Sequence, residues 1–244
     1  MNISLLILLI LLLSLFNMLQ LYFVRHGQTE WNKLGIPQGS ENDIELNDEG
    51  KIEALKTGIY LNKYRQKDSK FDMIISSPMK RTIETAQIIA KQINYNGDIE
   101  SDNNLIEASH GNDVNQREKD EIIAGWKNIR DPIERMHLLQ KYDSMIYDVC
   151  GKETTESIKN RCKIVMDNIL GTGKKKILIV THSVIIINMI RHMFNLTLEI
   201  PHGQKTGTCS VMYVTYNDSK FNLVSLSTNE HLEFIKIKDN EEIY

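Results

Sequence analysis

The chain has 244 residues, enough for one substantial α/β domain with its own core and too few for two. Its 29 basic and 32 acidic side chains nearly balance, giving a formal net charge of −3, and no lysine or arginine cluster forms a stripe. A general affinity for nucleic acid is therefore not expected. The three cysteines, Cys150, Cys162 and Cys209, fit neither a disulfide framework nor zinc-ligand spacing, so we interpret them as reduced structural residues.

Residues 1–18 differ in character from the rest of the chain. Residues 3–19, ISLLILLILLLSLFNML, are almost wholly apolar but shorter than the roughly 20 residues that usually span a bilayer. No Lys or Arg precedes Arg25 and the cleavage geometry is poor, so a secretory signal is the least favoured interpretation. We interpret residues 1–18 as a membrane anchor or a dispensable leader. Residues 19–244 are expected to form a cytoplasmic domain; if the apolar segment is an anchor, Arg25 and Lys33 on its carboxyl side place this domain on the cytoplasmic face.

The amino-terminal half of this domain contains three predicted strands and two predicted helices. Residues 19–24 predict a buried strand, because a short apolar run before a glycine-containing polar stretch is typical of a parallel sheet. A helix is predicted over residues 47–66, where apolar residues recur near helical spacing and acids occupy the first turn. A strand follows over 71–76, and Pro78 indicates the first turn of a helix that runs to about residue 93. A short strand and an irregular stretch through residue 107 come next.

The carboxyl-terminal half begins with a predicted insertion. Residues 112–153 are polar, with amphipathic helical patches around Trp126 and Met136, and we predict a small helical cap over one end of the sheet. A helix is predicted over 154–170, with the capping pattern TTES at its start and Gly171 as its stop. The sequence KKILIVTHS then predicts a buried strand, and a helix is predicted over 184–194. Alternating runs at 209–216 and 221–226 predict a hairpin-like pair that closes the sheet.

Strands that alternate with helices predict an α/β fold with a doubly wound, mostly parallel sheet and helices on both faces. In such sheets ligands bind at the carboxyl ends of the strands. Five side chains are expected at that edge, each directly after a predicted strand or in the segment that follows it: Arg25, His26, Arg81, Glu107 and His182.

The chemistry of these five side chains indicates an anionic ligand. Two arginines and two histidines would repel one another unless an anion such as a phosphoryl group lay among them. A histidine can accept a phosphoryl group and pass it to water, and the other cations can stabilise the transition state, so we expect neither a cofactor nor a metal. Glu107 can protonate the leaving oxygen. The alternatives are a solvated loop carboxylate for Glu107 and a solvated surface charge for Arg81.

Five motifs in order resemble the histidine phosphatase superfamily, in the branch that contains phosphoglycerate mutases and fructose-2,6-bisphosphatases: RHGQTEWN with PQG soon after, SSPMKRTIETA, LIEASHG, IVTHS and NEHL. The resemblance covers residues 19–232 and is weakest in the cap. It implies a phosphoglycerate mutase-like fold, with His26 as the phosphorylated nucleophile and Glu107 as the proton donor. It also implies a phosphate pocket of Arg25, Arg81 and His182. Further pocket residues that it implies are Asn32, Gln38, Gly39 and Ser183, the last standing where the family often has glycine.

One departure from the family bears on the reaction. Mutases of this family usually carry a longer basic, glycine-rich stretch after the acid, whereas this chain has EASHGNDVNQREKDE. We therefore predict a phosphatase that hydrolyses a small phosphorylated metabolite. A cofactor-dependent phosphoglycerate mutase and a non-catalytic phosphoester- or partner-binding module are the alternatives.

Other histidine-based readings are weaker. A metal site of His26, His182 and Glu107 is disfavoured because the neighbouring arginines would oppose a cation. Surface or packing roles are expected for His110, His202 and His231, which lack such neighbours.

Overall fold

A computed structural model describes residues 18–36, 38–65, 70–109, 153–196 and 206–237. Its centre is a six-stranded sheet with the strand order β3-β2-β4-β1-β5-β6. The strands are β1 (Leu19–Arg25), β2 (Met73–Ser76), β3 (Ile99–Ser101), β4 (Lys176–Thr181), β5 (Val211–Asn217) and β6 (Lys220–Thr228). The first four are parallel, and β5 and β6 are antiparallel additions beside β1, so the predicted mostly parallel sheet is confirmed.

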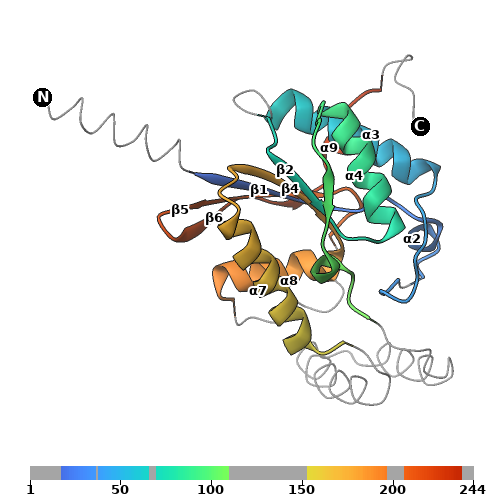
Figure 1. The fold of residues 1–244 in the computed structure, drawn as a ribbon. Coiled ribbons are helices and arrows are strands. Elements are labelled where there is room, and N and C mark those ends of the chain that lie inside the picture. Colours follow the sequence, from blue (N-terminus) through green and yellow to red (C-terminus); the bar gives the residue numbers. More distant parts are fainter. Residues whose placement is uncertain (1–17, 37, 66–69, 110–152, 197–205, 238–244) are drawn as a thin grey trace, which may run out of the picture.

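The central strands are buried because helices cover both faces of the sheet. Helices α3 (Asp48–Arg65) and α4 (Lys80–Gln92) lie on one face, and α7 (Thr155–Gly171) and α8 (Ser183–Phe194) lie on the other (Figure 1). Every residue of β2 and β4 is buried, which explains why these strands read as continuous apolar runs without alternation. Two apolar clusters result, one between the sheet and each helical layer.

Helix boundaries follow local capping chemistry. The side chain of Thr154 accepts a hydrogen bond from Ser157 N, which confirms the predicted start of α7. Asn47 Oδ1 similarly accepts from Gly50 N, 2.8 Å away, before α3. The prediction that Pro78 lies in the first turn of α4 is wrong. That helix begins at Lys80 after an extended Met79, so Pro78 lies in the bend between strand and helix.

The antiparallel end of the sheet is the predicted hairpin. Strand β6 is longer than the predicted run of 221–226, whereas β5 begins later than the predicted residue 209. Asp218 and Ser219 connect the strands with φ angles of 49° and 61°. Positive φ at both central residues is typical of a two-residue type I′ turn, whose twist matches the paired strands. Three short elements were not predicted: α2 (Glu30–Lys33), α9 (His231–Phe234) and the 3-10 turn η1 (Asn103–Leu105), each too short to show periodicity.

Two predicted features lie outside the described residues. They are the apolar segment of residues 1–18 and the cap of residues 112–153, each except for its last residue. In the ranges that the structure describes, no helix is long and apolar enough to cross a membrane.

Candidate active site

The candidate site lies at the carboxyl ends of three neighbouring strands, β2, β4 and β1. Arg25 is paired with Thr181 in the register of β1 and β4. The next residue, His26, extends the ladder by donating its N–H to Thr181 O, 3.0 Å away. His182 directly follows Thr181, and the ring centroids of the two histidines are 5.3 Å apart. The sheet thus brings together two histidines that are far apart in the sequence.

The imidazole of His26 is fixed by its own loop. Its Nδ1 lies 2.7 Å from Gly27 O, so Nδ1–H donates to that carbonyl and the lone pair stands on Nε2. Gly27 N donates to Thr85 Oγ1 of α4 at 3.0 Å. A Cβ at Gly27 would lie 2.5 Å from Gly50 O, so only glycine permits this approach of the loop to α3. Burial, with Arg25 and Arg81 nearby, holds the pKa of His26 well below its usual range and keeps the ring neutral.

His182 is the amino-terminal cap residue of α8 and is fully buried. Its Nε2 lies 2.9 Å from Ser77 Oγ, at the end of β2. When the Ser77 hydroxyl donates, Nδ1 of His182 carries the proton and is a donor. Burial, together with His26 and the arginines, lowers the pKa of His182 well below its ordinary value, so this ring is also neutral. The expected repulsion therefore reduces to that between two arginines.

Arg81 lies in the first turn of α4 and has no exposed surface, which excludes the alternative of a solvated charge. Its Nη1 donates to Asn42 O at 2.8 Å and its Nη2 to Gly39 O at 3.4 Å. Burial lowers the pKa of Arg81, but arginine starts so high that the guanidinium stays charged. A buried cation at the positive end of a helix is unfavourable without an anion beside it.

Arg25 is held from the opposite side of the site. Its Nη1 donates to Thr206 O, and Thr206 N in turn donates to Ser183 Oγ at 3.1 Å. Glu53 of α3 lies close enough to favour the charged form, although burial lowers the pKa of Arg25 overall. The Glu53 carboxylate accepts from Gln28 N at 2.8 Å and so ties α3 to the loop after His26.

Glu107 is 6% exposed, which excludes the alternative of a solvated loop carboxylate. Its Oε1 accepts from Ala108 N at 2.9 Å. Burial raises the pKa of Glu107 above its ordinary value, although hydrogen bonds from Ala108 and Val184 N and the charges of Arg81 and Arg25 act in the opposite direction. A carboxyl group in this environment holds its proton to a higher pH than a solvated glutamate does.

The remaining predicted pocket residues are of three kinds. Gln38 is buried, and neither its Oε1 nor its Nε2 has a hydrogen-bond partner. Ser183 and Gly39 act through the arginines, since Ser183 holds Thr206 and Gly39 O accepts from Arg81. Asn32 closes the capping box of α2, where its Oδ1 accepts from Thr29 N at 3.1 Å, so this oxygen is already engaged within the protein.

Unsatisfied polar atoms are concentrated at this site. Among the described residues, six buried side-chain N or O atoms have no hydrogen-bond partner, and five of them belong to predicted site residues. These five are Arg25 Nε, Arg81 Nε, His182 Nδ1, Gln38 Nε2 and Gln38 Oε1. Buried polar atoms in folded proteins are nearly always paired. Four donors left free at one place therefore fit a ligand that carries several acceptor oxygens.

Several supporting residues were missed from the sequence. Ser77 and Thr85 lie within the motif SSPMKRTIETA, and their positions after a strand and one helical turn from Arg81 were the available signals. Glu53 and Thr206 gave no signal, because their roles depend on contacts between distant segments.

The packing role expected for His231 is confirmed. This residue is buried, its Nε2 lies 2.8 Å from Thr57 Oγ1, and its ring stacks on Tyr60 with centroids 4.7 Å apart. Burial and the charge of Lys56 lower the pKa of His231 to about 4. His110 and His202 lie outside the described residues. Within the described ranges, no group of three or more His, Cys, Asp or Glu side chains is arranged to hold a metal ion.

Comparison with known proteins identifies the family. The sequence model of the histidine phosphatase superfamily (branch 1) matches residues 21–229. A similar curated protein is the uncharacterized phosphatase PhoE of Bacillus subtilis (strain 168), which is 27% identical over 218 residues, or 87% of this chain and 97% of that protein.

Two solved structures have a similar fold. A phosphoglycerate mutase of Bacillus anthracis (str. Sterne) superposes with a TM-score of 0.71 at 22% identity, covering 89% of this chain and 96% of that one. A phosphoserine phosphatase of Entamoeba histolytica, in complex with phosphoserine, superposes with a TM-score of 0.65 at 23% identity, covering 87% and 98%.

The chain belongs to the histidine phosphatase superfamily. This membership confirms the resemblance seen in the sequence motifs, the phosphoglycerate mutase-like α/β fold and the prediction of an enzyme.

Proposed function

We propose that the protein is a phosphatase that hydrolyses a small phosphorylated metabolite through a phosphohistidine at His26. The observation that carries this proposal is the group of unpartnered buried atoms on Arg25, Arg81, His182 and Gln38. A phosphoryl group has three terminal oxygens and two negative charges, and so matches both the free donors and the two buried guanidinium groups.

The first step forms a bond from His26 Nε2 to phosphorus and breaks the bond from phosphorus to the ester oxygen. His26 is suited to attack because its ring is neutral and its Nδ1–H is held by Gly27 O. Arg25, Arg81 and the Nδ1–H of His182 stabilise the charge on the terminal oxygens. Glu107 gives its proton to the leaving oxygen and becomes a carboxylate, which releases an alcohol.

The second step returns the site to its starting state. The Glu107 carboxylate takes a proton from a water molecule, whose oxygen attacks the phosphorus of phosphohistidine. The bond between phosphorus and Nε2 breaks, inorganic phosphate is released, and Glu107 is again protonated. The two buried arginines supply the positive charge that these steps need, so we propose that turnover requires no metal.

A small metabolite is proposed as the substrate on two grounds. The free donors lie within a buried site, which suits a phosphoryl group carried on a compact molecule. A structure of similar fold is described as a phosphoserine phosphatase in complex with phosphoserine, a small phosphomonoester. Hydrolysis is favoured over mutase activity because the stretch EASHGNDVNQREKDE lacks the basic, glycine-rich character of family mutases.

The test is turnover of p-nitrophenyl phosphate and of a panel of alkyl phosphates, with 3-phosphoglycerate included, in the presence of a chelator. Phosphate release from both classes is expected. Isomerisation of 3-phosphoglycerate with added bisphosphate, without release of phosphate, would support the mutase. Loss of turnover on chelation would overturn the metal-free mechanism.

The cytoplasmic location and the role of residues 1–18 as anchor or leader stay predictions. Cell fractionation of the full-length chain and of a chain that begins at Met18 tests both. An anchor predicts membrane association only for the full-length chain.

A further inference from the structure

The stretch that leads to Glu107 is held by side chains from two other parts of the fold. Arg161 of α7 donates from Nη1 to Asn104 O at 2.6 Å and to Ile106 O at 2.9 Å. Ile106 is joined by the peptide bond to Glu107. Between these two carbonyls, Leu105 O accepts from Thr181 Oγ1 at 2.7 Å. Three consecutive carbonyls before the acid are therefore bound by side chains.

The rest of the Arg161 guanidinium is held by Glu153. Its Nε and Nη2 donate to Glu153 Oε1 and Oε2, each at 2.6 Å, in a bidentate ion pair whose side chains are 18% and 15% exposed. Ser157 Oγ also donates to Glu153 Oε1 at 2.7 Å. Burial acts to raise the pKa of Glu153, but these hydrogen bonds outweigh it and the pKa is lowered. The carboxylate therefore stays charged and orients the arginine.

The same group also holds the backbone on the far side of the acid. Glu153 N donates to Ser109 O at 3.3 Å, two residues after Glu107. Arg161 and Glu153 together thus bind backbone groups at positions 104, 106 and 109, which bracket Glu107. We name this group, Arg161 with Glu153, the acid clamp.

We propose that Arg161 is a positioning residue for the general acid: through the acid clamp it sets the place of the Glu107 carboxyl relative to the leaving oxygen. This inference rests on the proposed function, in which Glu107 protonates that oxygen. Within the described residues, the Arg161 guanidinium donates to Glu153 and to backbone carbonyls beside Glu107, so its loss is expected to matter most for a substrate whose leaving group needs a proton.

The test compares Arg161→Met with wild type on an alkyl phosphate and on p-nitrophenyl phosphate. Proton donation matters for a poor alkoxide leaving group and little for p-nitrophenolate. We expect kcat/KM for the alkyl phosphate to fall by at least about tenfold and that for the aryl phosphate by less than about threefold, since general acid catalysis contributes about 10²- to 10⁴-fold in total.

A double-mutant cycle separates positioning from folding. In a Glu107→Gln background, Arg161→Met is expected to cause less than about threefold further loss on the alkyl phosphate, because the group that it positions is already unable to donate. Losses that multiply, or equal losses on both substrates, would overturn the proposal and indicate a general structural role.

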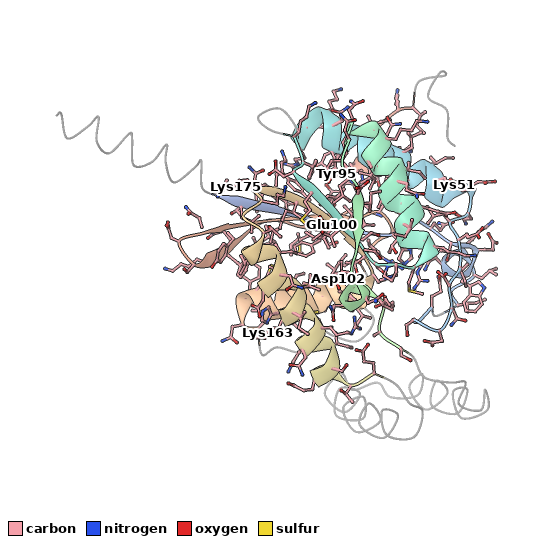
Figure 2. All side chains as sticks on the ribbon, in the orientation of Figure 1. Lys51, Tyr95, Glu100, Asp102, Lys163 and Lys175 are labelled. Atoms are coloured by element: carbon pink, nitrogen blue, oxygen red, sulfur yellow. The ribbon has the colours of Figure 1, made fainter. Side chains whose placement is uncertain are left out.

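A second variant keeps the test valid if the first one does not fold. Arg161→Lys retains the charge beside Glu153 but lacks the planar fork that reaches Asn104 and Ile106, so a smaller loss selective for the alkyl substrate is expected. Equal losses of kcat/KM on the alkyl and aryl phosphates in this variant would likewise overturn the proposal. The matched control is Lys163→Met on the same helix. Lys163, labelled in Figure 2, is exposed and pairs with the equally exposed Asp167, so its replacement should leave both activities unchanged.

Failure of this inference can be told from failure of the proposed function. If wild type hydrolyses both substrates and Glu107→Gln is selective for the alkyl phosphate while Arg161→Met is not, only the role of Arg161 is wrong. If Glu107→Gln lowers kcat/KM equally for both substrates, the assignment of the acid itself is wrong.

Discussion

Arg25, His26 and His182 lie on or directly after paired strands, whereas Glu107 follows a 3-10 turn and a short irregular stretch at the edge of the sheet. The first group is held by the backbone ladder of β1 and β4, which survives a change of side chain. The acid is held by side chains of Arg161 and Thr181. Figure 2 labels two residues that precede it, Glu100 in β3 and Asp102, which caps η1. We call Arg25, His26, Arg81 and His182 the phosphate side of the site, and Glu107 with the residues that hold it the acid side. A substitution on the phosphate side should remove one functional group and leave the backbone in place. A substitution on the acid side can also move the Glu107 carboxyl group.

The largest effect is expected for His26→Ala, which removes the nucleophile without disturbing the ladder. Turnover of both aryl and alkyl phosphates should be abolished, together with the acid-labile, base-stable phosphohistidine that is trapped when wild-type turnover is quenched. His192→Ala on the exposed side of α8 is the control and should keep both. Label that persists in His26→Ala would show that another residue is phosphorylated.

Glu107→Gln keeps the shape of the side chain and removes the transferable proton. We expect kcat/KM for an alkyl phosphate to fall by about 10²- to 10⁴-fold, while kcat/KM for p-nitrophenyl phosphate falls far less, because only the alkoxide needs a proton in the first step. The value of kcat should fall for both substrates, because Glu107 is also the base that activates water in the second step. Phosphohistidine formation from the aryl substrate should survive. Glu100→Gln on the exposed edge strand serves as the matched control.

Arg81→Lys tests the phosphate side, where a substitution should slow both substrates rather than the alkyl phosphate alone. Lysine keeps the charge but loses the planar fork, so both substrates should be slowed by a similar factor of about 10². Parallel kinetics on the two substrates and a phosphate-inhibition constant measure this. Lys80→Met, at an exposed ion pair with Glu45, should have no effect on either. A loss confined to the alkyl phosphate would contradict the division into two sides.

The pH dependence of kcat/KM distinguishes the phosphate side from the acid side without a substitution. Neutral His26 requires a pH above its pKa, which burial and the arginines lower, and protonated Glu107 requires a pH below its pKa, which burial raises. For an alkyl phosphate, kcat/KM should therefore fall as the pH rises through the raised pKa of Glu107. This fall should be absent in Glu107→Gln and with p-nitrophenyl phosphate. An identical alkaline fall in all three profiles would assign it to another group.

The smallest effect is expected for Ser183→Ala, because Ser183 acts on Arg25 only through Thr206. Loss of the two neutral hydrogen bonds that Ser183 Oγ accepts from Thr206 N and Oγ1 should raise KM for both substrates by about two- to tenfold. Thermal unfolding should confirm that the variant is folded. An unchanged KM would show that Thr206 is held adequately by its other contacts.

The phosphate side could be predicted from the sequence because its signals are local. His26 and His182 end apolar runs that read as buried strands, and the carboxyl ends of parallel strands meet at one edge. Arg81 is found by the same argument, since it lies in the first turn of the helix after β2. The error at Pro78 was confined to the boundary between that strand and its helix, where a bend and a first helical turn use the same residue types.

The sequence by itself determined the order of strands and helices, the residues at the strand ends and the family. Only the tertiary structure decided that both histidines are neutral, that Glu107 is buried and that four donors are left without partners. It also decided the acid clamp, in which Arg161 reaches a carbonyl 57 positions away. The physical reason is that local patterns depend on neighbouring residues, whereas burial, pKa and unsatisfied hydrogen bonds depend on which distant segments the fold brings into contact.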